Sequence, residues 1–279
     1  MISKIVNIGK IRVSNELPFV FIGGPCAIES MESCTFICEQ VMDICGSLGI
    51  EYIFKSSFDK ANRTSISGQR GVGIDEGLEI LAAVKEKYGI PVLTDVHLPD
   101  QCARVAQAAD ILQIPAFLCR QTDLLEAAAK TGKPVNVKKG QFISPNDMEN
   151  VIAKLQHFGA SDILLTDRGT CFGYNALISD FKGIPIMAKT GYPVIYDATH
   201  SIQTPSSQGK FSGGERDFAP ILARAAVGVG VAGIFMEVHD NPDKAPCDGP
   251  NMLPLSSLKQ VLVELLELDE VSKKFPRYI

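Results

Sequence analysis

Eight short runs of β-branched and aliphatic residues recur along the chain, and segments with the apolar spacing of helices separate them. Strands that alternate with helices predict a (β/α)8 TIM barrel, whose active site lies at the carboxyl ends of the strands. At or just beyond those ends the runs carry side chains that can do chemistry: Cys26, Lys55, Ser57, Asp95, Gln113, Lys138, Lys139, Asp167, Arg168, His200, Glu237 and His239. Since every run ends in this way, we predict that the chain is an enzyme.

The two ends of the chain predict elements outside the barrel strands. Polar and apolar residues alternate over residues 4–13 around a turn signal, which predicts a β-hairpin within residues 1–15 that closes the bottom of the barrel. The clearest internal helix covers 145–158, where Ser144 is the expected N-cap. A last helix is expected over 255–272.

Two connections are longer than the short loops usual between strands and helices. Residues 58–74 and 201–217 are polar and rich in glycine or serine, and both follow predicted strand ends. Loops of this length within a compact domain are usually lids or binding loops. No composition shift divides the chain, so we expect one barrel domain over residues 1–279.

Charge and composition narrow the class of partner. The net charge of −5 argues against a surface that binds nucleic acid or anionic membranes. No apolar run approaches the length of about 20 residues that spans a bilayer, and the N-terminus lacks a signal pattern. The eight cysteines are scattered without a CxxC pair. We therefore expect a cytoplasmic protein in a reducing compartment.

Cationic residues recur at the predicted strand ends, where they can converge on one mouth of the barrel. Several cations around one pocket of an acidic protein indicate a substrate with more than one negative group, such as a phosphate and a carboxylate. The alternative is that each is a solvated residue on the rim. The residues concerned are Lys55, Lys60, Arg63, Lys138, Lys139 and Arg168.

A second group has the chemistry of metal ligands. Cys26, His200 and Glu237 end strands that are neighbours around a closed barrel, and Asp248 follows the last strand. This mixture of soft and hard ligands suits Zn²⁺, Fe²⁺ or Mn²⁺. Spacing alone leaves two alternatives open, because Cys26 could be a buried thiol and His200 a general base or a structural histidine.

Several motifs, in order along the chain, resemble those of the 3-deoxy-D-manno-octulosonate 8-phosphate synthase family: GGPCAIES, FKSSFDKANRTS, QIPAFLCRQTDL, NVKKGQF, DRGTCFGY, DATHSIQ and CDGP. The resemblance runs from about Phe19 to about Leu258. It implies a (β/α)8 barrel that assembles as a homotetramer. It also implies condensation of phosphoenolpyruvate with arabinose 5-phosphate and water, with release of inorganic phosphate, to make a precursor of lipopolysaccharide.

The resemblance also assigns residues to the two substrates. The phosphoenolpyruvate carboxylate and phosphate would be held by Lys55, Ser57, Lys60, Gln113, Lys138 and Arg168. Arabinose 5-phosphate would be held by Asn62, Arg63 and Thr64, with Arg63 on its phosphate. Phe117 and Arg120 would reach the sugar-phosphate site of a neighbouring subunit.

The family divides into metal-dependent and metal-independent members, and the metal-independent ones carry asparagine where this chain has Cys26. The resemblance is therefore to the metal-dependent type, with a divalent ion (Zn, Fe, Mn or Co) on Cys26, His200, Glu237 and Asp248. In the reaction, Lys138 and Arg168 would stabilise developing charge. As a hypothesis, the proton-transfer network comprises Asp95, His200, Glu237 and Asp248.

Three other functions remain open from the sequence. A related synthase would use phosphoenolpyruvate with another aldose, such as erythrose 4-phosphate or a mannosamine derivative. A Schiff-base aldolase would use Lys138 or Lys139 as its nucleophile. A barrel that binds sugar phosphates without turnover would act as a sensor. The KANRT stretch favours a five-carbon sugar phosphate as the second substrate.

Overall fold

Eight parallel strands close into a barrel in the computed structural model, which describes residues 3–63, 65–66, 68–204 and 213–275. The last barrel strand pairs with the one before it and also with the first, so the ring has no free edge. This confirms the predicted (β/α)8 TIM barrel. In order around the ring the strands are β3 (Val20–Gly24), β4 (Tyr52–Lys55), β5 (Val92–Asp95), β6 (Ile111–Ile114), β7 (Val135–Lys138), β8 (Ile163–Asp167), β11 (Val194–Asp197) and β14 (Gly233–His239).

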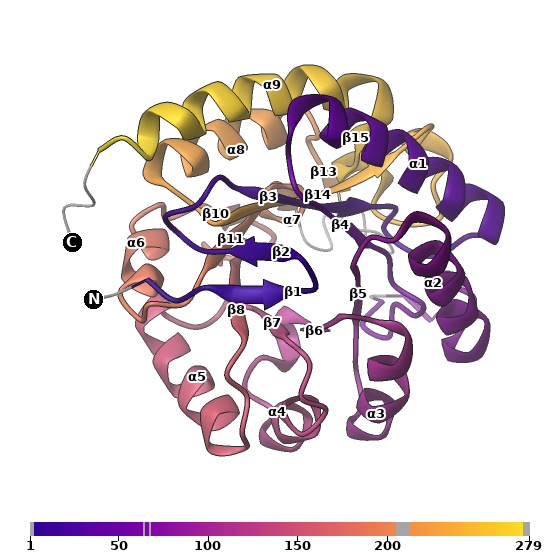
Figure 1. Cartoon of the computed structure of the whole chain (residues 1–279), viewed down its shortest axis with the longest axis horizontal. Coiled ribbons are helices and arrows are strands. Elements are labelled where there is room, and N and C mark those ends of the chain that lie inside the picture. The colour runs from indigo at the N-terminus through magenta and orange to yellow at the C-terminus, as the bar shows by residue number, and fades with distance from the viewer. Residues whose placement is uncertain (1–2, 64, 67, 205–212, 276–279) are drawn as a thin grey trace.

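Helices surround the barrel, and Figure 1 shows them as an outer ring. Every residue of the barrel strands is buried, because side chains point alternately into the barrel and against this layer. The helices are α1 (Met31–Leu48), α2 (Ile74–Tyr88), α3 (Pro99–Ala108), α4 (Thr122–Ala129), α5 (Met148–His157), α6 (Gly183–Ala188), α8 (Phe218–Val229) and α9 (Leu255–Ser272). Helix α9 has the predicted bounds.

The helix predicted over 145–158 begins differently. Pro145–Asp147 form a 3₁₀ turn, η2, and the α-helix α5 starts only at Met148. Ser144 does cap this turn, since its hydroxyl accepts from the backbone N–H of Asn146 at 3.2 Å. A 3₁₀ turn of this kind is frequent at the start of an α-helix.

The predicted N-terminal hairpin is also confirmed. Strands β1 (Val6–Ile8) and β2 (Ile11–Val13) pair antiparallel, with Val6 opposite Val13. Figure 1 shows them lying across one end of the barrel. Their alternate residues are buried in one apolar cluster with barrel-lining residues: Val6, Ile8, Ile11, Val13, Val20, Ile22, Ile53, Leu93, Ile111, Leu164, Ile195, Ala232 and Phe235. We call this cluster the barrel floor.

Short elements that the sequence did not predict lie in the connections. They are β9 (Thr170–Cys171), β10 (Leu177–Ile178), α7 (Ala198–Ser201), β12 (Gln203–Thr204), β13 (Gly213–Gly214), β15 (Leu253–Pro254), η1 (Ala116–Leu118), η3 (Pro242–Lys244) and η4 (Gly249–Asn251). Strands β12 and β13 pair within the predicted 201–217 loop. Among the described residues, no helix is long and apolar enough to cross a membrane.

Candidate active site

A cavity of about 460 Å³ opens at the carboxyl ends of the barrel strands, opposite the floor. Its volume is within the range of small-molecule sites. Among the described residues, six cationic side chains line it and only three carboxylates do, although the chain as a whole is acidic. The cations are Lys55, Lys60, Arg63, Lys138, Arg168 and Arg216, and the carboxylates are Asp95, Asp243 and Asp248.

Most of the predicted site residues meet at this cavity. Lining it are Lys55, Lys60, Asn62, Arg63, Asp95, Gln113, Phe117, Lys138, Arg168, His200 and Asp248. Ser57, Cys26 and Glu237 are buried directly behind the lining, in contact with Asp95, Asp248 and Lys55 respectively. Arg120 is not among the lining residues of the described chain. Thr64 lies outside the described residues.

Lys139 is the exception among the predicted cations. Its side chain is fully buried, and its ammonium donates to the carbonyl oxygens of Gly140 and Gly169 and to the Thr170 hydroxyl, at 3.1–3.5 Å. The expectation that it joins the mouth was wrong, because successive residues of a strand point to opposite faces. Lys138 points inward, and Lys139 ties the loops after β7 and β8 together.

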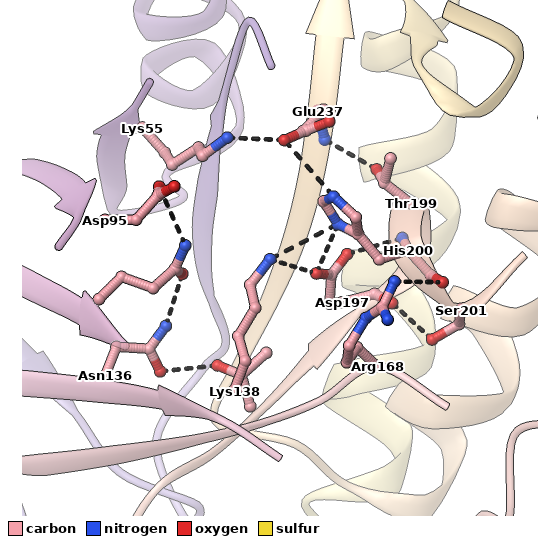
Figure 2. A network of polar contacts seen from close by, with 12 residues as sticks. Lys55, Asp95, Asn136, Lys138, Arg168, Asp197, Thr199, His200, Ser201 and Glu237 are labelled. Atoms are coloured by element: carbon pink, nitrogen blue, oxygen red, sulfur yellow. Dashed lines mark hydrogen bonds and ion pairs between the residues drawn. The ribbon is translucent and has the colours of Figure 1, made fainter. Parts of the chain in front are cut away.

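Lys55 on β4 and Glu237 on β14 form a buried ion pair, and only β3 lies between these two strands. The Lys55 ammonium lies 2.6 Å from Glu237 Oε1 and also donates to the Cys26 carbonyl at 2.9 Å. Figure 2 shows Glu237 between Lys55 and His200. Burial alone raises the pKa of the Glu237 carboxyl, but the positive charges of Lys55, His200 and Lys60 outweigh it and hold that pKa well below its usual value. Glu237 is therefore an anion.

Asp197 joins Lys138 and His200, and the sequence argument did not find it. Its Oδ2 accepts from the Lys138 ammonium at 2.6 Å and lies 2.7 Å from His200 Nδ1 (Figure 2). Burial raises the pKa of Asp197, yet His200 and Lys138 outweigh burial and hold it far below its usual value. Strand alternation was an available signal, because Asp197 shares the inward face of β11 with Ile195.

Asp95 is the acceptor of a second group. The Ser57 hydroxyl donates to its Oδ1 at 2.7 Å, the Gln113 amide approaches the same oxygen at 3.5 Å, and His97 Nε2 lies 3.5 Å from Oδ2. Burial raises the pKa of Asp95, but Lys60 and then His97 hold it well below its usual value. The mouth thus holds three buried carboxylates that stay ionised beside cations.

Arg168 and Gln203 connect two of the loops around the cavity. The Arg168 guanidinium donates to Gln203 Oε1 at 2.5 Å and to the His200 carbonyl at 3.2 Å. The Gln203 amide in turn donates to Asp248 Oδ1 at 3.4 Å. Gln203 and Arg216 were not predicted individually, although both lie in the 201–217 segment that was expected to bind or cover a ligand.

Three of the four predicted metal ligands gather at one point. Ligand atoms of Cys26, Glu237 and Asp248 all lie within 4.8 Å of one another. His200 Nε2 is 3.7 Å from Glu237 Oε1, at the edge of this cluster. Glu237 Oε2 is buried without a hydrogen-bond partner in the described part of the chain. An unsatisfied buried carboxylate oxygen beside a thiol and a second carboxylate fits a divalent cation.

The backbone around these ligands is shaped for their approach. A Cβ on Gly24, whose φ is +152°, would lie 2.1 Å from the Lys55 carbonyl oxygen, so only glycine allows β3 to end here before Cys26. Asp248 has a φ of +50°, a left-handed conformation that few non-glycine residues adopt. This conformation places its Oδ2 3.2 Å from the Cys26 thiol, which donates to it. Such local strain is typical of functional sites.

Comparison with known proteins matches the whole barrel. A family profile, described as the DAHP synthetase I family, matches residues 3–274. A protein of Rickettsia bellii (strain OSU 85-389) named 2-dehydro-3-deoxyphosphooctonate aldolase is 57% identical over 271 residues, which cover 97% of this chain and 99% of the relative. Proteins of the same name from Granulibacter bethesdensis and Rickettsia prowazekii are 56% and 55% identical, each over 97% of this chain and over 96% and 98% of the relative.

Proposed function

The chain belongs to the DAHP synthetase I family, and we propose that it condenses phosphoenolpyruvate with arabinose 5-phosphate and water. The products are 3-deoxy-D-manno-octulosonate 8-phosphate, which leads to lipopolysaccharide, and inorganic phosphate. The observation that carries the proposal is the cationic cavity at the catalytic end of a barrel whose relatives bear the name of this activity. Two phosphorylated substrates, one of them also a carboxylate, match six cations around one pocket.

Phosphoenolpyruvate binds deepest in this proposal, where the cations come from the strands themselves. Lys138 and Arg168 face its phosphoryl and carboxyl oxygens and stabilise the charge that develops on them. Gln113 supplies an uncharged N–H donor from β6, and Ser57, whose hydroxyl donates to Asp95, completes this side of the site beyond β4. Because these side chains rest on rigid strand ends, they hold the enol carbon in line with the aldehyde that it attacks.

Arabinose 5-phosphate binds nearer the rim, through Asn62 and Arg63 and through Thr64, which lies outside the described residues. Arg63 Nη2 is buried without a hydrogen-bond partner in the described part of the chain, which supports an anion there. Phe117, 55% exposed, and Arg120 serve a neighbouring subunit in a homotetramer. The chain acts as one barrel domain in the cytoplasm.

Cys26, His200, Glu237 and Asp248 hold a divalent metal ion (Zn, Fe, Mn or Co) in this proposal, which makes the protein of the metal-dependent type. Such an ion, when bound, supplies Lewis acidity toward a substrate carbonyl or water. The chain orients these ligands through their neighbours. Asp197 fixes the ring of His200 through Nδ1 and leaves Nε2 toward Glu237.

Proton transfer falls to the buried acids and the histidine at the mouth. His200 stands between Asp197 and Glu237, with Nδ1 2.7 Å from Asp197 Oδ2 and Nε2 3.7 Å from Glu237 Oε1, and in this proposal it exchanges protons with water or a substrate hydroxyl. Asp95, which stays ionised, holds Ser57 and His97 in place beside the substrate. Asp248 borders the cavity as a further carboxylate within this network.

Phosphate release tests the proposal. The protein is dialysed against a chelator and supplied with phosphoenolpyruvate and arabinose 5-phosphate, with and without Mn²⁺ or Zn²⁺. Activity that disappears on chelation and returns with metal supports both the reaction and the metal site. Full activity without metal would support the synthase reaction and contradict the metal site. Activity only with erythrose 4-phosphate, or a borohydride-trapped adduct on Lys138, assigns the chain to one of the rival reactions.

Replacing the thiol tests the ligand set by a second readout. Cys26→Asn removes the soft ligand and, by the family pattern, yields an enzyme that tolerates chelators. Metal content, measured by plasma mass spectrometry after dialysis, should fall well below one ion per chain in this variant. Wild-type metal content in Cys26→Asn would exclude Cys26 as a ligand, whatever the activity.

A further inference from the structure

A row of hydrogen bonds crosses four neighbouring barrel strands, from the lining of the cavity to the layer just beneath it. The Thr166 hydroxyl donates to Asn136 Oδ1 at 2.7 Å, and the Asn136 amide donates to Gln113 Oε1 at 2.9 Å. Gln113 Nε2 then faces Asp95 Oδ1 at 3.5 Å. Figure 2 shows the labelled Asn136 and Asp95 at two points of this row. All four side chains are buried, from 0% to 6% exposed.

The charge of Asp95 sets the direction of every bond in the row. An ionised carboxylate only accepts hydrogen bonds, so Gln113 turns its NH₂ group toward Asp95 and its oxygen toward Asn136. Asn136 must then offer its own NH₂ to that oxygen, and its Oδ1 takes the Thr166 proton. The opposite orientation of either amide would place two acceptors, or two donors, face to face.

This orientation decides what Gln113 presents to a ligand. Gln113 and Asp95 line the cavity, whereas Asn136 and Thr166 are fully buried beneath it and are not among its lining residues in the described chain. With its oxygen held by Asn136, Gln113 has an N–H left for the cavity. An anion requires a donor at that point, because a carbonyl oxygen would repel it.

We propose that Asn136 is a positioning residue for anion binding, which holds the Gln113 amide so that a donor faces the phosphoenolpyruvate. Thr166 supports it from behind. The proposal rests on the proposed function for the identity of the anion. It extends the binding site one layer beneath the residues that touch the substrate, through the uncharged side chains of Asn136 and Thr166.

Titration calorimetry with phosphoenolpyruvate, without arabinose 5-phosphate, measures the effect without turnover. Asn136→Leu removes the donor to Gln113 and should weaken phosphoenolpyruvate binding about tenfold or more, the scale of one hydrogen bond to a charged group. The KM for arabinose 5-phosphate should stay within about twofold, because Gln113 is assigned to the other substrate. Thr166→Val should weaken binding by a smaller factor, and Thr166→Ser should restore it.

Thr94→Val is the matched control. Thr94 is a fully buried strand threonine on β5, its hydroxyl has no hydrogen-bond partner in the described part of the chain, and strand alternation turns it away from the barrel interior. This variant should bind phosphoenolpyruvate as the wild type does. If Asn136→Leu does not fold, phosphoenolpyruvate binding by Thr166→Val is compared with that by Thr94→Val, and weaker binding in Thr166→Val alone supports the proposal.

Two results overturn the proposal: unchanged phosphoenolpyruvate binding in both Asn136→Leu and Thr166→Val, or an equal loss in Thr94→Val. Failure of the proposed function has a different signature, since the wild type would then release no phosphate from the two substrates. Titration with inorganic phosphate still tests the row in that case. A wild type that binds neither anion contradicts both.

Discussion

Two layers of the barrel interior, built by the same strands, have opposite chemistry. The floor residues on six strands are Ile53, Leu93, Ile111, Leu164, Ile195 and Phe235. Two positions further along the same strands, on the same face, stand Lys55, Asp95, Gln113, Thr166, Asp197 and Glu237. A step of two residues is roughly 7 Å of strand. A dry core and a polar, mostly charged site are therefore adjacent layers of side chains.

The two layers differ in the kind of contact that stabilises a buried side chain. A floor residue gains from contact with any apolar neighbour, so its stabilisation is spread over many contacts. A buried charge needs a particular partner, because an unpaired one costs several kcal/mol. Glu237 has Lys55, and Asp197 has Lys138. The floor residues therefore stabilise the fold, whereas the charged residues at the cavity serve function at some cost in stability.

Lys138→Met should have the largest effect and confine it to catalysis. The substitution removes a cation from the phosphoenolpyruvate site but leaves Asp197 paired with His200 at 2.7 Å. We expect kcat/KM for phosphoenolpyruvate to fall roughly 10³-fold or more, the scale of lost electrostatic stabilisation in an enclosed site. Steady-state phosphate release measures it.

Lys139→Met, one residue away, is the control for that variant. It removes the donor that Gly140, Gly169 and Thr170 share in the barrel wall. The free energy of unfolding should fall by about 1–3 kcal/mol because buried acceptors lose their donor, and kcat/KM should fall far less than in Lys138→Met. Equal kinetic losses in the two variants would contradict the division between mouth and wall.

Leu93→Ala should show the reverse pattern in the floor. Leu93 is fully buried, two residues before Asp95 on β5. Loss of its side chain leaves a cavity and should lower the free energy of unfolding by about 2–5 kcal/mol. Urea unfolding measures this change, and kcat and both KM values should stay within a few-fold of the wild type. A large fall in kcat would show that the floor also positions the site.

The same contrast explains how much the sequence could predict. Floor and strand ends follow from local patterns, and so do the hairpin and the helix over 255–272. The partners in the mouth do not, because Lys55 and Glu237 are 182 residues apart and meet only once the ring closes. No local pattern encodes which cation faces which carboxylate.

Some missed residues left a usable signal, and others left none. Counting by twos from the apolar inward Ile195 would have found Asp197. On β7 the inward face carries Asn136 and Lys138, so counting back from Lys138 would have found Asn136 and excluded Lys139. Gln203 had no such signal. It lies in a connection whose course depends on the contacts with Arg168 and Asp248.

Arg63→Ala should have a smaller effect than Lys138→Met or Leu93→Ala. It should change the KM for one substrate only. Arg63 stands at the rim, 4.0 Å from Asp248. Without its charge, the KM for arabinose 5-phosphate should rise about 10- to 100-fold, the scale of a hydrogen bond between charged groups. The KM for phosphoenolpyruvate should hardly change. Arg70→Ala is the control, since Arg70 pairs with Asp59 in the same connection. Equal increases in the KM values for both substrates would contradict the assignment of Arg63 to the phosphate of arabinose 5-phosphate.

Asp95→Asn should change the pH dependence of stability, which no floor residue can do. Lys60 and His97 outweigh burial and keep the pKa of Asp95 below its unfolded value, which is about 3.9. A carboxyl of this kind stabilises the fold fully above its unfolded pKa, and the contribution is lost as pH falls below it. Wild-type stability should therefore fall more steeply below about pH 4 than that of Asp95→Asn.

The free energy of unfolding plotted against pH distinguishes a variant in the site layer from a variant in the floor, by its value at neutral pH and by its slope. At neutral pH Asp95→Asn should be less stable than the wild type by about 1 kcal/mol, and the two curves should converge as pH falls, since the amide does not titrate. Leu93→Ala should instead lower the whole curve and leave its slope unchanged. Urea unfolding from pH 7 to pH 3 gives both quantities. Parallel curves for Asp95→Asn and the wild type would mean that Lys60 and His97 do not hold the pKa of Asp95 below its unfolded value.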